Sequence, residues 1–162
     1  MAARGQHRLL DRRSRAPGFR LELLAGGETT LAGILAGGPA LLAFFKISCP
    51  VCQLTFPFLE RIHSAGALRI YGISQNGPGD TREFNQEFGV TFPILLDSEE
   101  NGFPTSNDYG ISSVPTLFLL ERDGTIANVI EGWRKREMEA LAAQTGGGLF
   151  RPGDYVPEWK AG

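Results

Sequence analysis

The chain has 162 residues, 42% of them hydrophobic and 21% charged, a composition typical of one globular domain rather than of a disordered or fibrous protein. Sixteen basic and eighteen acidic residues leave a formal net charge of −2, which argues against a general nucleic-acid binder, because such proteins neutralise phosphates with basic groups. Two cysteines and two histidines are too few for a disulfide scaffold, or for a self-contained zinc site unless His7 takes part.

The start of the chain, residues 1–15, is rich in arginine and is predicted to be flexible. It contains the pair Arg12-Arg13, but the apolar segment that an export signal requires does not follow before Pro17. The longest apolar stretch, Leu31 to Phe45, is interrupted by Gly37, Gly38 and Pro39, so it cannot form the apolar helix of roughly 20 residues that crosses a bilayer. We therefore expect a cytoplasmic protein without a membrane span; a periplasmic location requires that the true start is misassigned.

The hydrophobic pattern predicts strands that alternate with helices. Phe19 to Leu24 alternates apolar and polar residues, which is typical of a half-buried strand. Ala40 to Ile47 is nearly all apolar, as in a strand buried on both faces of a largely parallel sheet. Pro50 to Ser64 follows as an amphipathic helix. The other predicted elements are a helical turn at Leu31–Leu35, strands at Leu68–Ser74 and Phe92–Asp97, a helix capped by Asp80 or Thr81 and ending near Phe88, hairpin strands at Pro115–Glu121 and Thr125–Glu131, and a last helix at Trp133–Ala143.

This order of elements predicts an α/β protein with a mixed sheet covered by helices. The tail, residues 146–162, is rich in glycine and proline and is predicted to be extended or irregular. Its sequence leaves open whether it packs on the domain or binds a partner.

Cys49-Pro50-Val51-Cys52 lies where the buried strand ends and the amphipathic helix begins. This position places the first sulfur over the free backbone N–H groups of the first helical turn. The positive end of the helix dipole favours a thiolate, and thiols at such sites have a pKa lowered from about 8.5 to roughly 3.5–7.5. A thiolate attacks disulfides, and a neighbouring thiol can resolve the mixed disulfide that forms.

A CxxC motif also occurs as half of a zinc site or as a pair of buried structural thiols. The zinc interpretation lacks the other ligands, and the strand–CxxC–helix setting favours redox chemistry. Two prolines accompany the motif. Pro57 lies inside the helix, where it removes a hydrogen bond, and Val114-Pro115 enters a strand from a loop, a setting in which the peptide bond can be cis.

CPVCQLTFP resembles the active-site helix of the thioredoxin superfamily, and VPT resembles its cis-proline loop, which lies beside the cysteines and holds the substrate backbone. The segments APGFRLEL, LLAFFKISCPVC, YGIS, FPILLD and YGISSVPTLFLLERDGTI are similar to the redoxin branch. That branch joins the peroxiredoxins (alkyl hydroperoxide reductase/thiol-specific antioxidant, AhpC/TSA) with the TlpA- and ResA-type thiol–disulfide oxidoreductases.

The resemblance implies a thioredoxin-like α/β fold: a central mixed β-sheet flanked by helices on both faces, with an extra N-terminal strand. It implies a redoxin domain over residues 16–145, between the flexible start at 1–15 and the tail at 146–162. It also implies that the Val114–Pro115 bond is cis.

Three positions separate the two kinds of redoxin. Peroxiredoxins carry a proline and a threonine or serine seven and three residues before the peroxidatic cysteine, which corresponds to Cys52; here these positions are Phe45 and Cys49. They also place an arginine at the start of the strand that here begins with Pro115. The resemblance therefore favours a dithiol–disulfide exchanger over a peroxidase.

Two departures from thioredoxins concern the surroundings of the first cysteine. Ser48 replaces the tryptophan before it, and Ala43 stands where thioredoxins have a buried aspartate that helps to move protons. Proton transfer must then use water, another acid or no specialised group. Lys46 can add a positive field near the sulfur, although most lysines at strand ends point into solvent. Asp97 to Glu100 is predicted to be a solvated acidic loop.

The favoured hypothesis is a thiol–disulfide oxidoreductase in which Cys49 attacks and Cys52 resolves. Its expected partners are a protein or small-molecule disulfide or thiol and an unidentified reductant or oxidant, without nucleic acid, and the chain is expected to be a monomer or a weak dimer. No metal, nucleotide or flavin site is indicated, so no cofactor is expected. A redoxin-type thiol peroxidase and a non-catalytic binding module are the alternatives. The residues expected to bind the substrate are Ser48, Pro50, Val51, Ser113, Val114, Pro115 and Thr116.

Overall fold

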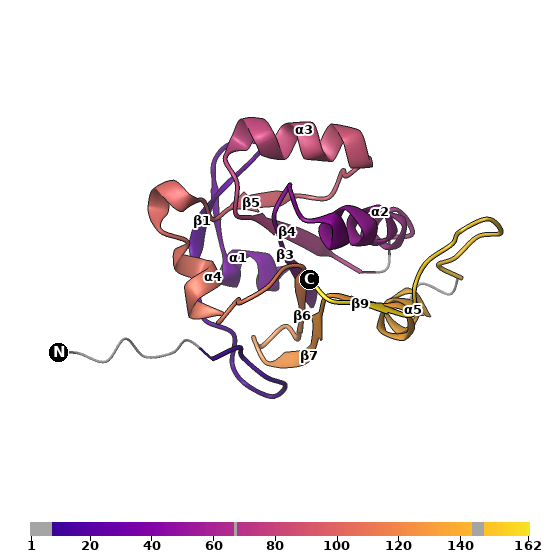
Figure 1. The fold of residues 1–162 in the computed structure, drawn as a ribbon. Helices are drawn as coiled ribbons and strands as arrows, with labels where there is room; N and C mark the ends of the chain where they lie inside the picture. Colours follow the sequence, from indigo (N-terminus) through magenta and orange to yellow (C-terminus); the bar gives the residue numbers. More distant parts are fainter. Residues whose placement is uncertain (1–7, 67, 144–147) are drawn as a thin grey trace.

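The computed structural model describes residues 8–66, 68–143 and 148–162. A seven-stranded mixed sheet, in the order β2-β1-β5-β4-β3-β6-β7, has helices on both faces (Figure 1). Its strands are β1 (Arg20–Leu23), β2 (Glu28–Thr30), β3 (Ala40–Phe45), β4 (Ile70–Ser74), β5 (Ile94–Leu96), β6 (Thr116–Leu120) and β7 (Ile126–Glu131). A separate pair consists of β8 (Trp133–Arg134) and β9 (Trp159–Lys160), and the helices are α1 (Leu31–Ala36), α2 (Pro50–Ser64), α3 (Pro78–Phe88), α4 (Pro104–Asp108), α5 (Lys135–Ala143) and the 3-10 turn η1 (Glu99–Asn101).

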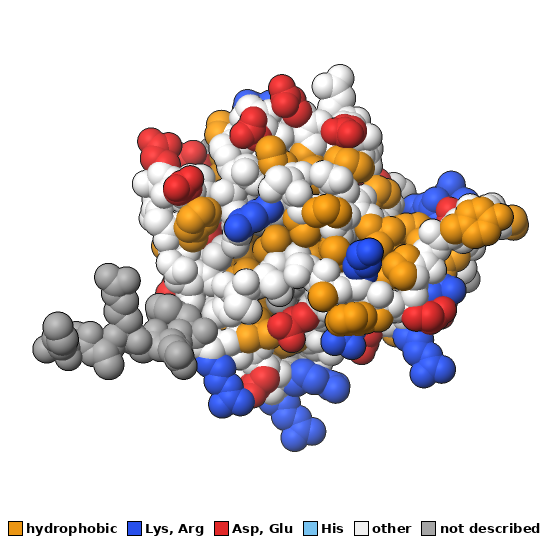
Figure 2. Space-filling model, in the orientation of Figure 1, with side chains coloured by type: hydrophobic (Ala, Val, Ile, Leu, Met, Phe, Trp, Pro, Cys, Tyr) orange, Lys and Arg blue, Asp and Glu red, His pale blue; other side chains and the backbone are white. Residues whose placement is uncertain are grey.

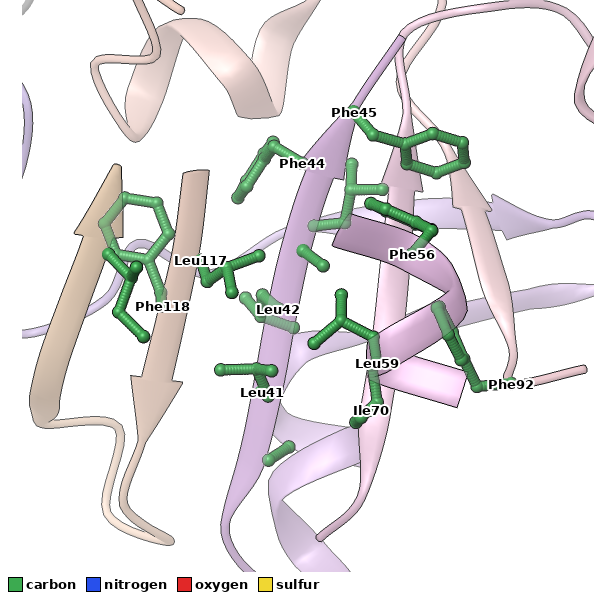
Figure 3. Packing of buried hydrophobic residues seen from close by; sticks show 14 of the residues in the cluster. Leu41, Leu42, Phe44, Phe45, Phe56, Leu59, Ile70, Phe92, Leu117 and Phe118 are labelled. Carbon is green, nitrogen blue, oxygen red and sulfur yellow. The ribbon is translucent and has the colours of Figure 1, made fainter. Parts of the chain in front are cut away.

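Strand β3 lies at the centre of the core, and all six of its residues are buried. It pairs parallel with β4 and antiparallel with β6, so the predicted strand with two buried faces is confirmed and the sheet is mixed. Successive side chains of a strand point to opposite faces, and Figure 3 shows Phe44 and Phe45 on opposite sides of β3. The ring of Phe45 lies 4.2 Å from that of Phe56 in α2, and the ring of Phe44 lies 5.3 Å from that of Tyr109 after α4. The two layers of helices are thus packed against one strand.

The start of α3 differs from the prediction. The helix begins at Pro78, its N-cap is Gly77, and no side chain caps it, so the expected cap by Asp80 or Thr81 is wrong. Proline suits the first helical position because its ring fixes φ and the N–H that it lacks would have no partner there. Thr81 lies one turn inside, where its hydroxyl contacts the Ser74 hydroxyl at 2.7 Å and donates to the Gly77 carbonyl.

Asp97 is fully buried, so the solvated loop predicted for it is wrong. Its carboxylate accepts hydrogen bonds from the backbone N–H of Thr105, at 3.0 Å, and from the N–H and hydroxyl of Ser106, at 2.7 and 2.6 Å. These three donors at the start of α4 replace the hydrogen bonds with water that the carboxylate loses when it is buried. Glu99 and Glu100 are exposed, as expected.

At its start the described chain runs beside β7. The N–H of Arg13 donates to the carbonyl of Ile126, and the N–H of Ile126 donates to the carbonyl of Ser14, both at 2.8 Å. The expected flexible start, residues 1–15, can be compared with the structure only from residue 8. Residues 12–15 lie along β7 and the turn before it, and the N–H of Leu10 donates to the carbonyl of Tyr109 at 3.4 Å. The limits of the predicted domain, 16–145, stay a prediction.

The tail, described from residue 148, packs back on the domain. Strand β9 pairs with β8, Trp133 being opposite Lys160, and the indole N–H of Trp133 donates to the Pro157 carbonyl at 2.6 Å. Arg61 in α2 donates two hydrogen bonds to Asp154, at 2.6 and 3.2 Å. The last helix therefore begins at Lys135, two residues later than predicted, because Trp133 and Arg134 pair with the tail as β8. Among the helices of the described residues, none is long and apolar enough to cross a bilayer.

Candidate active site

Cys49 is the N-cap of α2, four residues after β3 ends. Its sulfur accepts a hydrogen bond from the backbone N–H of Cys52 at 3.2 Å, which satisfies one of the free N–H groups of the first turn. Pro50 occupies the first helical position. The structure therefore confirms the place of the cysteine pair that the sequence predicted.

The surroundings of Cys49 favour its thiolate. Hydrogen bonding from the Cys52 side chain, then from the backbone N–H groups of Cys52 and Val51, and finally the charge of Lys46 lower the pKa of Cys49 to about 6, although partial burial opposes this change. Lys46 is exposed, as expected, and its charge contributes least. At neutral pH most of the Cys49 sulfur is therefore in the nucleophilic form.

Cys52 has the opposite character. It is fully buried, and burial, followed by its interaction with Cys49, raises its pKa far above the ordinary range. Both cysteines are free thiols in this structure. The site thus combines one reachable thiolate with one protonated thiol a single helical turn further in.

The loop before β6 brings a distant segment to the cysteines. The Val114–Pro115 peptide bond is cis, as the resemblance implied, and the Cys49 sulfur lies 3.3 Å from the Val114 carbonyl oxygen, to which its protonated form donates. The hydroxyl of Thr116 donates to the Ser113 carbonyl at 2.8 Å and ties the loop to β6. This loop forms one wall of the site.

A hollow of about 330 Å³ lies beside the Cys49 sulfur, lined by Lys46, Cys49, Gln75, Ile111, Ser112, Ser113, Val114 and Gly162. Figure 2 shows hydrophobic side chains gathered across the middle of the face on which the C-terminal end lies, with charged side chains mainly toward the rim. Of the expected substrate-binding residues, the structure places Ser113 and Val114 in the lining of the hollow, Ser48 and Pro50 on the exposed surface, and Val51, Pro115 and Thr116 in buried positions.

Two side chains that the sequence analysis did not single out hold the loop before Cys49. The side-chain oxygen of Asn76 accepts from the N–H of Ile47, and the side-chain amide of Gln53 donates to the carbonyl of Ile47, both at 3.0 Å. Asn76 belongs to a stretch whose composition indicated only a loop. No spacing in the sequence points to either contact, because each depends on how the elements pack.

Gln75 connects the hollow to the buried carboxylate. Its side-chain amide donates to the Ser106 hydroxyl at 2.9 Å, and that hydroxyl donates to Asp97. Within the described ranges, no group of three or more His, Cys, Asp or Glu side chains is arranged to hold a metal ion.

The sequence is similar to proteins named as thiol-disulfide oxidoreductases or as thioredoxin-like. It is 29% identical to the thiol-disulfide oxidoreductase ResA of Geobacillus thermodenitrificans (strain NG80-2) over 128 residues, which are 76% of this chain and 71% of that protein. It is also 29% identical to the thioredoxin-like protein YneN of Bacillus subtilis (strain 168) over 131 residues, 76% of this chain and 74% of that protein.

Two similar solved structures come from Mycobacterium tuberculosis. A secreted disulfide oxidoreductase superimposes with a TM-score of 0.64 and 25% identity, covering 77% of this chain and 94% of that chain. The peroxidoxin BcpB superimposes with a TM-score of 0.71 over 85% of this chain and 97% of that chain, but its identity of 17% shows a shared fold alone. The model of the AhpC/TSA family matches residues 13–129, most of the chain. The protein therefore belongs to the AhpC/TSA family and has a thioredoxin-like fold.

Proposed function

We propose that the protein is a thiol–disulfide oxidoreductase in which Cys49 is the attacking nucleophile and Cys52 the resolving thiol. The observation that carries this proposal is the contrast between the two sulfurs: Cys49 is only partly buried and has a pKa of about 6, whereas Cys52 is buried and stays protonated. Relatives named thiol-disulfide oxidoreductase ResA support the same activity.

The reaction begins when the Cys49 thiolate attacks one sulfur of a substrate disulfide. The second substrate sulfur leaves as a thiolate, and a mixed disulfide forms with Cys49. Cys52 then gives up its proton to the departing substrate thiolate or to water, and its sulfur attacks Cys49. This step breaks the bond between Cys49 and the substrate sulfur that it first attacked, releases that sulfur as a thiolate and leaves a Cys49–Cys52 disulfide, so two electrons have passed to the substrate. The reverse sequence oxidises a dithiol, and the redox partner sets the direction.

The substrate is expected to dock beside the loop before β6. Ser113 and Val114 line the hollow at Cys49 and are proposed to contact the substrate, together with Ser48 on the exposed surface. The other residues of the expected set are proposed to shape the site: Pro50 at the first helical position, and the buried residues Val51, Pro115 and Thr116. This assignment is supported by the distance of 3.3 Å between the Cys49 sulfur and the Val114 carbonyl oxygen.

Reduction of insulin disulfides with dithiothreitol as the electron source tests the proposal. Cys49→Ser removes the attacking sulfur, so turnover should fall to the uncatalysed rate. Cys52→Ser leaves the attack intact but removes the resolving sulfur, so mixed disulfides should accumulate and be visible on a non-reducing gel. Turnover in Cys49→Ser equal to that of the unchanged protein would refute the assignment, provided that both variants melt at the temperature of the parent.

A thiol peroxidase remains the second candidate, because a thiolate with a pKa of about 6 is also the form that peroxides oxidise. The positions of Phe45 and Cys49 relative to Cys52 argue against it, as does the complete burial of Cys52. Consumption of hydrogen peroxide by stopped flow separates the two functions, since a peroxidase must react far faster than a free thiol. A non-catalytic binding module would instead show partner binding that survives the loss of both sulfurs.

The expected partners are protein or small-molecule disulfides and thiols, with a reductant or oxidant still to be identified. The expectation of a monomer or weak dimer without a cofactor stays a prediction. One similar structure is described as a secreted protein, so the comparisons give the expected cytoplasmic location no support.

A further inference from the structure

The last residues of the tail lie against the loop that walls the active site. Gly162 lines the same hollow as Cys49. A Cβ atom at Gly162 would overlap the carbonyl oxygen of Val114 and lie 2.7 Å from its carbonyl carbon. The Cys49 sulfur lies 3.3 Å from this same carbonyl oxygen. In Figure 1 the C-terminal end lies at the centre of the face, near the ends of β3 and β6.

The tail reaches this place along a second glycine. Gly132 has a φ of +69°, and a Cβ atom there would overlap the carbonyl oxygen of Lys160 and lie 3.2 Å from the backbone nitrogen of Gly162. The backbone of residues 160–162 therefore packs directly on the backbone of Gly132 and of the Val114–Pro115 bond. Main chain against main chain is the arrangement that an extended peptide adopts when it adds to an exposed edge.

The first part of the described tail, residues 148–157, is firmly packed against α2. Phe150 lies with its ring 5.2 Å from that of Phe58 in α2, and Arg61 in the same helix binds Asp154 through two hydrogen bonds. Arg61 also donates to the Leu149 carbonyl at 3.2 Å. The base of the tail is thus fastened to the helix that carries the cysteines.

Residues 159–162 are held less firmly. Strand β9 has only two residues, and a two-stranded ribbon is marginal in water. Trp159 is 56% exposed, and the Lys135–Glu158 pair is 3.5 Å long with Glu158 78% exposed, so this pair contributes little. The end of the tail can leave its place while residues 148–157 stay packed.

We propose that residues 159–162 are an internal competitor for the substrate groove: they occupy the backbone edge at Val114 that an extended polypeptide disulfide needs, and they must move before such a substrate docks. This inference rests on the proposed function, and it identifies polypeptides as the substrates whose docking the tail hinders. A small disulfide reaches the Cys49 sulfur from the hollow without using that edge, so the tail does not exclude it.

When a segment of the chain competes with the substrate, the apparent affinity for the substrate equals the intrinsic affinity multiplied by the fraction of molecules in which the groove is free. If the groove is free in roughly 10–30% of molecules, displacement of the tail raises kcat/KM for a polypeptide substrate by roughly three- to tenfold.

The test compares two valine substitutions in the same tail. Gly162→Val places a side chain where the Val114 carbonyl lies, and displaces the end of the tail. Gly148→Val is the matched control, because a Cβ atom there meets nothing within 4 Å. Lys160→Pro is a second displacing variant, since proline cannot donate a hydrogen bond to β8 at this paired position. For each protein kcat/KM is measured with insulin and with hydroxyethyl disulfide.

The expected result is a gain of roughly three- to tenfold on insulin in Gly162→Val and Lys160→Pro. Turnover of hydroxyethyl disulfide should be unchanged in Lys160→Pro, whose substituted residue does not line the hollow, and the Gly148→Val control should be unchanged on both substrates. The inference would be overturned if kcat/KM for insulin rose in neither displacing variant, or if kcat/KM rose equally for both substrates. Either result would leave the proposed function intact. Absence of exchange on both substrates in the unchanged protein would overturn the proposed function and this inference with it.

Discussion

The backbone N–H of Cys52 donates to the sulfur of Cys49 at 3.2 Å, so the second cysteine of the pair helps to ionise the first. Burial, followed by the hydrogen bond between the two cysteine side chains, raises the pKa of Cys52. Two thiols one helical turn apart are thereby in opposite protonation states at neutral pH. Their order in the reaction follows from this difference, because only the thiolate attacks.

The first prediction concerns the pH dependence of Cys49. Its pKa is lowered to about 6, so the thiolate is present above pH 6 and is lost as the pH falls below it. Alkylation by iodoacetamide should therefore be half-maximal near pH 6, whereas an unperturbed cysteine needs about pH 8.5. Thiolate absorbance at 240 nm in the reduced protein should follow the same curve. A single transition above pH 8 would contradict the proposed ionisation of Cys49.

The second prediction separates the two contributions of Cys52. Cys52→Ala removes the side-chain hydrogen bond, which is the largest cause of the lowered pKa, but keeps the backbone N–H that donates to the Cys49 sulfur. The pKa of Cys49 should rise above 6 and stay below that of a free cysteine. The alkylation curve of the variant measures this change. An unchanged curve would mean that the backbone donors alone hold the thiolate.

The third prediction links stability to the same thiolate. A group whose pKa is lowered by folding stabilises the folded state above its unfolded pKa, and this contribution disappears as the pH falls through the folded pKa. The reduced protein should thus gain stability relative to Cys49→Ser between pH 6 and pH 9, as measured by urea unfolding. A difference between the two proteins that is constant over this range would exclude the linkage. Oxidation to the Cys49–Cys52 disulfide removes the titrating group, so the oxidised protein should lack this pH dependence.

Local patterns predicted the part of the site that lies on one stretch of chain. The helix from Pro50 to Ser64 begins and ends at the predicted residues, because a proline at the first position and a regular apolar stripe define it. The resemblance of the VPT segment to the cis-proline loop supplied the second wall. Contacts between distant segments were not predictable from local patterns: the donors that surround Asp97, the grip on Ile47 and the pairing of Trp133 with the tail depend on tertiary packing.

The fourth prediction tests the hydrogen bond by which the Asn76 side chain holds the loop before Cys49. Asn76→Ala leaves the partly buried N–H of Ile47 without its acceptor, which costs about 1–2 kcal/mol of stability. Since the Lys46–Cys49 turn then loses one of its fixed points, insulin reduction should fall by roughly five- to thirtyfold, the factor that corresponds to a similar energy in the transition state. Gln86→Ala, on the exposed surface of α3, is the control and should change neither quantity. Full activity in Asn76→Ala would show that the loop needs no such support.

The fifth prediction concerns the buried carboxylate of Asp97. Asp97→Ala leaves the backbone N–H groups of Thr105 and Ser106 without an acceptor in the interior, so the free energy of unfolding should fall by about 3 kcal/mol. Glu99→Ala, in the same loop but exposed, should change it by no more than about 0.5 kcal/mol. Urea unfolding of the reduced proteins measures both. Because Ser106 also orients Gln75 at the edge of the hollow, Asp97→Ala should in addition raise KM for insulin more than it lowers kcat. Equal losses of stability in the two variants would show that the carboxylate does not hold the start of α4.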